Sequence, residues 1–176
     1  MDDYEAFIDR RHAGRVLASR MTKYAGRQDV IVLALPRGGV PVAYEVASAL
    51  AAPMDVFLVR KLGTPGHREL AMGAIASGGV RVINHDVVQW YGISASAIDH
   101  IAREEQEELE RRERAYRDDR PAPELTDKIV ILIDDGLATG STMRAAAQAV
   151  RARRPARTVV AVPVGAPQTC RTLGGR

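Results

Sequence analysis

The hydrophobic positions of this sequence gather in four short, largely apolar runs, and the segments between them mix apolar and polar residues. The runs cover residues 30–35, 54–59, 129–133 and 158–163. A strand that is apolar at every position is buried on both faces, which is typical of a parallel sheet covered by helices. Alanine-rich segments over 40–51 and 141–151 follow two of the runs and favour helices. The pattern predicts an α/β fold with a parallel central sheet flanked by helices.

Two further segments outside these runs have a recognisable pattern. Residues 3–24 carry apolar positions at helical spacing, with arginine and lysine outside that stripe, and predict an amphipathic helix. Residues 62–84 are interrupted by glycine and proline. Within them, 71–76 and 80–84 can pair as a β-hairpin across a glycine-containing turn.

A helical insertion is expected over residues 85–120. It consists of a short helix over 86–91 and a long one that Ser94 caps and that runs to about Tyr116. Residues 103–120 contain six arginines and eight acidic residues beside a narrow apolar stripe. Such a helix lies on the surface or packs against a partner, and it is only a weak candidate for RNA binding.

Size and composition are those of one domain over residues 1–176, of which 46% are hydrophobic. No apolar run reaches membrane-spanning length, and the first residues, Met-Asp-Asp-Tyr-Glu, are not a signal peptide. The single cysteine, Cys170, excludes an internal disulfide and fits a reducing compartment, so we expect a cytoplasmic protein. A net charge of +3 attracts polyphosphates but gives little support to nucleic acid as a partner.

The residues after the last apolar run have neither a strand pattern nor an aromatic side chain. The strand at 158–163 would then form an open edge of the sheet, which proteins normally cover or pair. We therefore expect one of two arrangements. Either the chain is a C-terminally truncated form of a longer protein, or another subunit covers the edge, as in a homodimer.

The chemistry centres on the segment that follows the apolar run 129–133. Asp134 and Asp135 come directly after the run, and a loop of small residues then leads into a helix. Amide groups at a helix N-terminus favour phosphate, which makes this turn a phosphate site formed by Ala138, Thr139, Gly140, Ser141 and Thr142. No lysine follows Gly140, so the loop is not that of a nucleoside-triphosphate P-loop. Carboxylates repel phosphate but accept hydrogen bonds from a diol, and a ribose 5-phosphate satisfies both halves.

Two other strand ends carry groups that suit an anion. Arg37, Gly38 and Gly39 follow the run 30–35, where the glycines let the backbone approach a ligand closely. Arg60 and Lys61 follow the run 54–59. Because the carboxyl ends of parallel strands meet at one edge of the sheet, we expect all three loops to surround one crevice.

These motifs resemble those of the type I phosphoribosyltransferases, and in particular those of a bacterial group of predicted phosphoribosyltransferases. The phrases that carry the resemblance are Leu-Pro-Arg-Gly-Gly-Val-Pro, Glu-Leu-Ala-Met-Gly-Ala and Asp-Asp-Gly-Leu-Ala-Thr-Gly. The resemblance implies the three-layer fold of that family and binding of phosphoribosyl pyrophosphate (PRPP). Asp134 and Asp135 would hold the ribose hydroxyls, and residues 138–142 the 5-phosphate. The pyrophosphate would be bound by Arg37, Gly38, Gly39, Arg60 and Lys61.

The resemblance also implies a cofactor, a lid and a backbone feature. Mg²⁺ would bind near Asp134 and Asp135, mostly through water. Residues 62–84 would form the flexible loop that closes over the reacting centre, and glycine hinges suit such a lid. Glu69 in this loop is a candidate acid–base or acceptor contact, with a solvated loop charge as the alternative. A non-proline cis peptide bond is expected next to Arg37, at Arg37–Gly38 or Pro36–Arg37.

The implied activity is that of a glycosyltransferase, which moves the 5-phosphoribosyl group from PRPP to a nitrogenous acceptor and releases pyrophosphate. Ala138 stands where the hypoxanthine–guanine enzymes have an acid, and the loop is more similar to that of the adenine enzymes, so a purine-like acceptor is one option. The alternative is a PRPP-binding regulator without catalysis that binds nucleic acid. A phosphatase or receiver domain fits poorly, because the acidic pair precedes a phosphate site.

Overall fold

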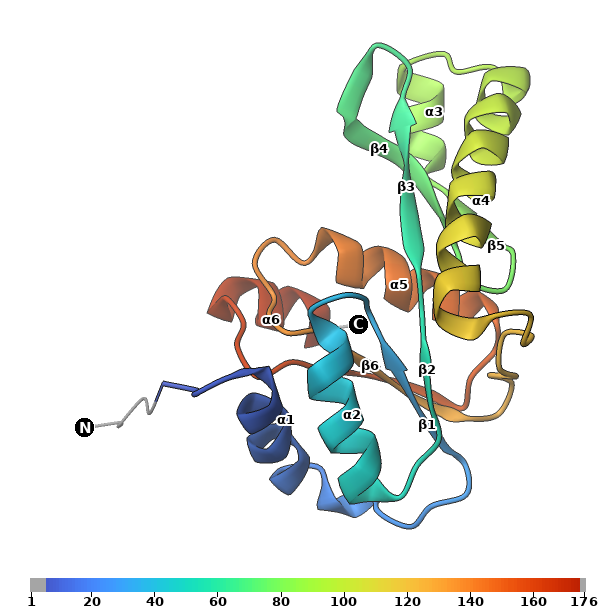
Figure 1. The fold of residues 1–176 in the computed structure, drawn as a ribbon. Coiled ribbons are helices and arrows are strands. Elements are labelled where there is room, and N and C mark those ends of the chain that lie inside the picture. The colour runs from blue at the N-terminus through green and yellow to red at the C-terminus, as the bar shows by residue number, and fades with distance from the viewer. Residues whose placement is uncertain (1–5, 175–176) are drawn as a thin grey trace.

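The core of the protein is a four-stranded parallel sheet, seen in a computed structural model that describes residues 6–174. Its strand order is β2-β1-β6-β7, and every neighbouring pair is parallel (Figure 1). The strands are β1 (Val30–Ala34), β2 (Met54–Val56), β6 (Ile129–Ile133) and β7 (Arg157–Ala161). Every residue of β1 and β6 is buried, which confirms the prediction from the uninterrupted apolar runs.

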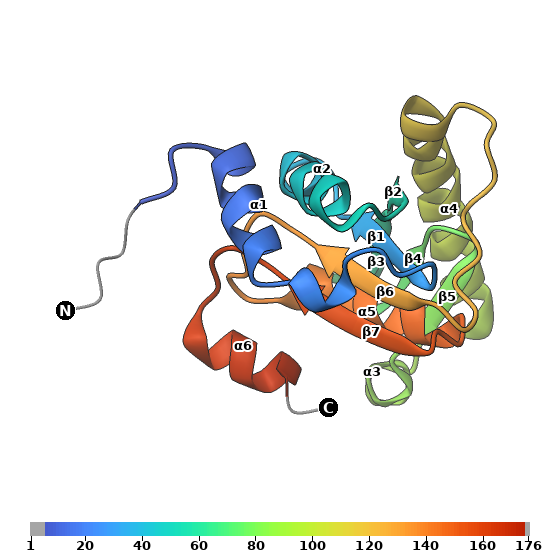
Figure 2. The ribbon, with the colours of Figure 1, turned by 90° about the horizontal axis from the view of Figure 1, so that it is seen from below.

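Helices cover both faces of this sheet. Figure 2 shows α1 (Arg10–Ser19) and α2 (Gly39–Leu50) on one side, and α5 (Ser141–Ala152) and α6 (Pro167–Gly174) on the other. Alternate residues of each strand enter two separate apolar clusters: Val32 packs with α1 and α2, and Leu33 packs with α5. The predicted three-layer arrangement is therefore confirmed.

A second unit rises from the end of this core (Figure 1). It is an antiparallel sheet in the order β3-β4-β5, with a helical pair packed against it. Its elements are β3 (Val59–Thr64), β4 (His67–Ala76), β5 (Val80–Ile83), α3 (His85–Trp90) and α4 (Ala95–Arg117). The predicted hairpin and both predicted helices are present, and the Ser94 hydroxyl caps α4 by accepting the Ala97 N–H. The apolar stripe of α4, with Leu109 fully buried, packs within the same chain.

The apolar run over 54–59 is not one strand, as its composition indicated. It divides into the end of β2 and the start of β3, which belong to different sheets. At the division, the Phe57 N–H donates to the Ala34 carbonyl, 2.8 Å away, and the Leu58 N–H donates to Ser77 Oγ at 2.9 Å. Val56, Phe57 and Leu58, the residues on either side of the division, are all buried, so the hydrophobic pattern carries no sign of the change of sheet. As a result, Arg60 and Lys61 lie within β3 and do not follow a strand of the parallel sheet.

The two ends of the chain also differ from the sequence prediction. The first helix begins at Arg10 because the Asp9 carboxylate caps it, accepting the His12 N–H at 2.7 Å. After this helix, only a 3₁₀ turn (Thr22–Tyr24) continues the predicted segment 3–24, whose first residues lie outside the described part. Near the other end, α6 forms where no element was expected.

Candidate active site

The loop after β1 and the loop after β6 touch directly. A Cβ atom on Gly38 would overlap the Asp135 carboxylate, and one on Gly39 would lie 2.6 Å from the Ile133 carbonyl oxygen. The Asp135 side chain limits the space at Gly38, and the backbone of Ile133 and Asp134 limits the space at Gly39, so glycine suits both positions. The Pro36–Arg37 peptide bond is cis, which is one of the two positions expected. The structure places the Arg37–Gly39 loop against the acidic pair, and the prediction that these residues bind one ligand stays a prediction.

The two carboxylates of the pair have different environments. Asp134 is partly buried and accepts the N–H of Asp135 at 2.8 Å. Burial, with a smaller contribution from neighbouring Asp135, raises the pKa of Asp134 to about 6. The Asp135 carboxylate is instead paired with Arg10, whose Nε lies 2.8 Å from Oδ2. Arg10 appeared in the sequence only as a charge outside a helical stripe, and no local signal links it to a residue 125 positions away.

The phosphate loop leads into α5 as predicted. Gly140 has a left-handed backbone with φ of 74°, and a Cβ atom there would lie 2.6 Å from Thr169 Cγ2 of α6. Thr169 Oγ1 in turn donates to the Ala138 carbonyl at 2.7 Å, so α6 helps to hold the loop in place. The Arg144 side chain donates to the Thr139 carbonyl at 2.7 Å. The first amides of α5 have no partners within the helix; the Ser141 N–H makes a long hydrogen bond of 3.4 Å to Thr139 Oγ1, and the turn suits an anion.

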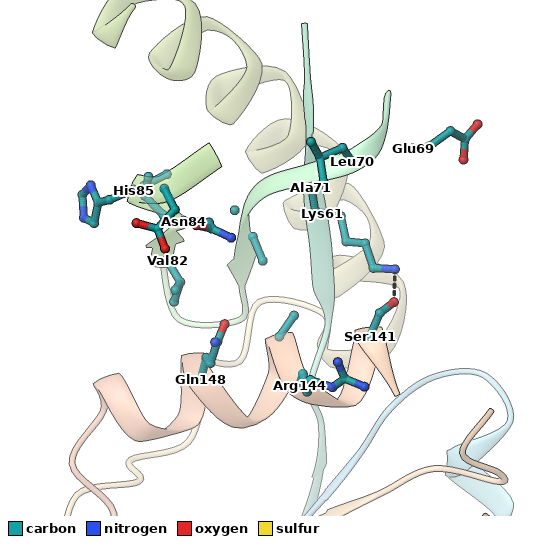
Figure 3. A pocket seen from close by; sticks show the side chains of 15 residues that line it. Lys61, Glu69, Leu70, Ala71, Val82, Asn84, His85, Ser141, Arg144 and Gln148 are labelled. Atoms are coloured by element: carbon teal, nitrogen blue, oxygen red, sulfur yellow. Dashed lines mark hydrogen bonds between the residues drawn. The ribbon is translucent and has the colours of Figure 1, made fainter. Parts of the chain in front are cut away.

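Arg60 and Lys61, which were predicted to act together on pyrophosphate, lie on opposite faces of β3. Alternation along a strand sends neighbouring side chains to opposite sides. The Lys61 ammonium donates to Ser141 Oγ in the phosphate loop, as Figure 3 shows. Arg60 pairs with Glu105 of α4 at 2.6 Å and lines a cavity of about 340 Å³ together with Arg37. The structure therefore brings Arg60 to the pyrophosphate loop and Lys61 to the phosphate loop.

Glu69 lies at the margin of a larger cavity, of about 760 Å³, between the antiparallel sheet and α5. Its side chain is exposed, and in Figure 3 its carboxylate points away from Lys61 and Ser141. Asn84, Arg144 and Gln148 also line this cavity. Among residues 6–174, Glu69 forms no hydrogen bond or ion pair, and its predicted acid–base role stays a prediction.

The acidic pair offers oxygen donors to a divalent cation. Within the part of the chain that the structure describes, no cluster of three or more histidine, cysteine, aspartate and glutamate side chains could hold a metal ion. Asp134 and Asp135 can offer carboxylate oxygens to a cation that keeps several of its waters. No helix in residues 6–174 combines the length and the apolar character needed to cross a membrane.

Comparison with known proteins finds relatives over almost the whole chain. Residues 5–171 match the model of the phosphoribosyl transferase domain. The chain is 50% identical over 159 residues to the predicted phosphoribosyl transferase Rv0571c of Mycobacterium tuberculosis strain H37Rv, a match that covers 90% of this chain and 36% of that protein. The chain thus spans about a third of the length of the curated relatives it matches.

Solved structures show the same relationship. TT1426 from Thermus thermophilus superposes with a TM-score of 0.85 at 42% identity, over 97% of this chain and 80% of that one. The purine phosphoribosyltransferase of Pyrococcus horikoshii, at 19% identity, shares the fold, with a TM-score of 0.53 over 93% of this chain and 77% of its own. With the family model matching nearly every residue and the expected loops in contact, the chain belongs to the phosphoribosyl transferase domain family.

Proposed function

We propose that this protein transfers the 5-phosphoribosyl group of PRPP to a nitrogenous acceptor and releases pyrophosphate. The observation that carries the proposal is the direct contact between Gly38 and Asp135. It joins a glycine loop that suits pyrophosphate to a carboxylate pair that suits a ribose diol. The helix N-terminus at Ser141 adds a phosphate site on the same loop as the pair.

Each part of PRPP then has its own set of residues. Asp134 and Asp135 accept hydrogen bonds from the ribose hydroxyls. The 5-phosphate is bound by Ala138, Thr139, Gly140, Ser141 and Thr142. We assign Lys61 to the 5-phosphate as well, because its ammonium group already lies on Ser141. The pyrophosphate is bound by Arg37, Gly38, Gly39 and Arg60.

Catalysis on this arrangement is positioning and charge stabilisation. The bond from the ribose C1 to pyrophosphate breaks as the acceptor nitrogen bonds to C1, and negative charge accumulates on the leaving group. Arg37 and Arg60 stabilise that charge in the transition state. Asp134 and Asp135 fit Mg²⁺ held mostly through water, and the ion, when bound, supplies positive charge to the pyrophosphate oxygens.

The acceptor is proposed as a purine-like base. The cavity beside Ser141 is lined by Asn84 and Gln148. The Asn84 oxygen already accepts the Val87 N–H, so Asn84 offers its amide donors, and Gln148 offers a donor and an acceptor to the edge of a base. Glu69 at its margin is the candidate to take the acceptor proton. A PRPP-binding regulator without turnover is the second candidate function. For either function, we propose that the protein resides in the cytoplasm, because its single cysteine fits a reducing compartment.

The test is PRPP binding by calorimetry with Mg²⁺, followed by pyrophosphate release with a panel of nucleobases. Asp134→Asn or Asp135→Asn should weaken PRPP about tenfold or more, because each carboxylate makes charge-assisted bonds worth roughly 1.5–3 kcal/mol. Turnover with any base supports the enzyme, and binding without turnover supports the regulator. Unchanged PRPP affinity in both variants would contradict the ribose assignment.

A further inference from the structure

The helical insertion, which the sequence presents as a charged surface helix, forms one wall of the cavity beside the pyrophosphate loop. The cavity of about 340 Å³ lies between four parts of the chain. The loop after β1 contributes Arg37, the start of β3 contributes Arg60, and α5 contributes Thr142. The last turns of α4 supply the remaining wall, with Arg111, Arg112, Ala115 and Tyr116.

The lining of this cavity is strongly positive. Four arginines line it, Arg37, Arg60, Arg111 and Arg112, and none of the acidic residues in the described range 6–174 does. Two carboxylates stand behind them: Glu105 pairs with Arg60 at 2.6 Å, and Glu108 pairs with Arg111 and Arg112 at 2.8 and 2.7 Å. Four positive and two negative charges leave a local excess of two. Within residues 6–174, the Arg37 side chain forms no hydrogen bond or ion pair.

The two α4 arginines that line the cavity, Arg111 and Arg112, are held in place but keep donors for a ligand. Arg111 uses Nε and one terminal nitrogen on Glu108, and Arg112 uses only Nε. A guanidinium has five N–H donors, so the terminal nitrogens of Arg112 remain available. The hydrogen bonds from Arg111 and Arg112 lower the pKa of Glu108 to about 2, so the carboxylate that holds them stays charged.

The end of α4 is fixed to the parallel sheet by a buried cation. Arg117 is 3% exposed and bonds to Asp55 at 2.8 Å, to Glu113 at 2.7 Å and to the Val56 carbonyl. Asp55 and Val56 belong to β2, which precedes the start of β3 by only a few residues. Nothing in the reaction uses Arg117. Its contacts instead hold the last turns of α4 over the cavity.

We propose that α4 completes the pyrophosphate site, and that Arg111 and Arg112 bind the outer phosphate of the diphosphate group of PRPP and of released pyrophosphate. The inference rests on the proposed function and adds residues to it that neither the sequence motifs nor the comparisons indicate. A diphosphate carries more negative charge than the excess of two that the cavity offers, and planar guanidinium groups match its oxygens. The insertion thereby has a role in binding besides covering the antiparallel sheet.

The experiment compares two double variants of the full chain. In the first, Arg111→Gln and Arg112→Gln remove both guanidinium groups from the cavity. In the control, Arg103→Gln and Arg114→Gln remove the same charge from exposed positions of the same helix that do not line the cavity. Calorimetry with Mg²⁺ measures binding of pyrophosphate, PRPP and ribose 5-phosphate to each protein, and circular dichroism checks that each is folded.

We expect the cavity variant to bind pyrophosphate and PRPP at least tenfold more weakly, with ribose 5-phosphate unchanged within twofold. The control variant should match the wild type. Equal weakening in both variants would show a general effect of charge and overturn the proposal. So would unchanged pyrophosphate affinity, an equal loss for ribose 5-phosphate, or no pyrophosphate binding by the wild type. A wild type that binds pyrophosphate but neither PRPP nor ribose 5-phosphate would refute the proposed function alone.

Discussion

The parallel core and the antiparallel unit place their functional groups in different ways. In the core, the groups sit on loops that follow a buried strand, as Asp134 and Asp135 follow β6. In the second unit, they sit on a strand and a helix and are joined by long-range pairs, such as Arg60 with Glu105. The first arrangement depends on close packing, because Gly38 lies against the Asp135 side chain and Gly39 against the backbone of Ile133 and Asp134. The second depends on side-chain ion pairs, so mutations should affect the two regions differently.

The largest effect is expected where the two core loops touch. Gly38→Ala places a methyl group into the Asp135 carboxylate, which must then leave its position. We expect PRPP affinity to fall about a hundredfold, equivalent to roughly 3 kcal/mol. Gly136→Ala is the matched control in the neighbouring loop, because a Cβ atom there meets nothing nearer than 3.9 Å. Calorimetry with PRPP on both variants makes the comparison, and equal affinities would contradict the packing argument.

The next effect concerns the attachment of the antiparallel unit. Arg117→Met leaves Asp55 and Glu113 without their shared guanidinium. Because breaking a buried ion pair leaves uncompensated charge, the free energy of unfolding should fall by about 2–3 kcal/mol. Urea denaturation measures the loss. Arg114→Met, at an exposed position three residues earlier, should change the unfolding free energy by no more than about 0.5 kcal/mol. A similar loss in both variants would show that the buried contacts are not what holds α4.

A smaller pair of effects separates the two faces of β3. Arg60→Gln removes a guanidinium from the cavity beside the pyrophosphate loop, and Lys61→Gln removes the ammonium group on Ser141. We expect the first to weaken pyrophosphate about tenfold and the second to weaken ribose 5-phosphate by a similar factor. Each variant serves as the control for the other. The assignment fails if both variants lose affinity for the same ligand.

The difference between the two regions also explains how far the sequence could predict the structure. Uninterrupted apolar runs predicted β1 and β6 correctly. The loops after them contain the acidic pair, the glycines and the helix N-terminus that indicate a ribose phosphate site. Three features had no local signal. The change of sheet at Phe57 lies inside one apolar run, so burial looks the same on both sides. The pair of Arg10 with Asp135, and the position of Arg111 and Arg112 over the pyrophosphate loop, depend on how distant elements pack.

Helix α6 was missed for a different reason. The segment from Pro167 contains two threonines, a cysteine and a glycine, which favour a helix weakly, and Leu173 is its one large apolar residue. Its position is fixed by tertiary contacts: Leu173 packs against the α5 side of the core, and Thr169 bonds to Ala138. Tertiary packing therefore decides this helix, and propensity does not.

The smallest expected effect is a pH dependence that arises from Asp134 in the core loop. Burial raises the pKa of Asp134 to about 6 in the folded protein, above its ordinary value of 3.8. A carboxyl group whose pKa is raised by folding binds its proton more tightly in the folded state. Its stabilising contribution is complete below pH 4 and is lost as the pH rises through 6. Because Asp134 is only about half buried, the loss is on the order of 1 kcal/mol.

Asp134→Asn removes this titration while keeping an oxygen to accept the Asp135 N–H. In the absence of ligand and with EDTA present, the variant should therefore be more stable than the wild type at pH 7, by about 1 kcal/mol, and the two should converge near pH 4. Urea denaturation at pH 4, 5, 6 and 7 follows the difference. Asp119→Asn, at an exposed position after α4, should show no such trend. A difference that stays constant across this range, or that grows toward acid pH, would mean that burial does not destabilise the charged form of Asp134. The charged form of Asp134 would then be as stable in the folded protein as that of a surface carboxylate. Electrostatics would no longer distinguish the core site from the second unit.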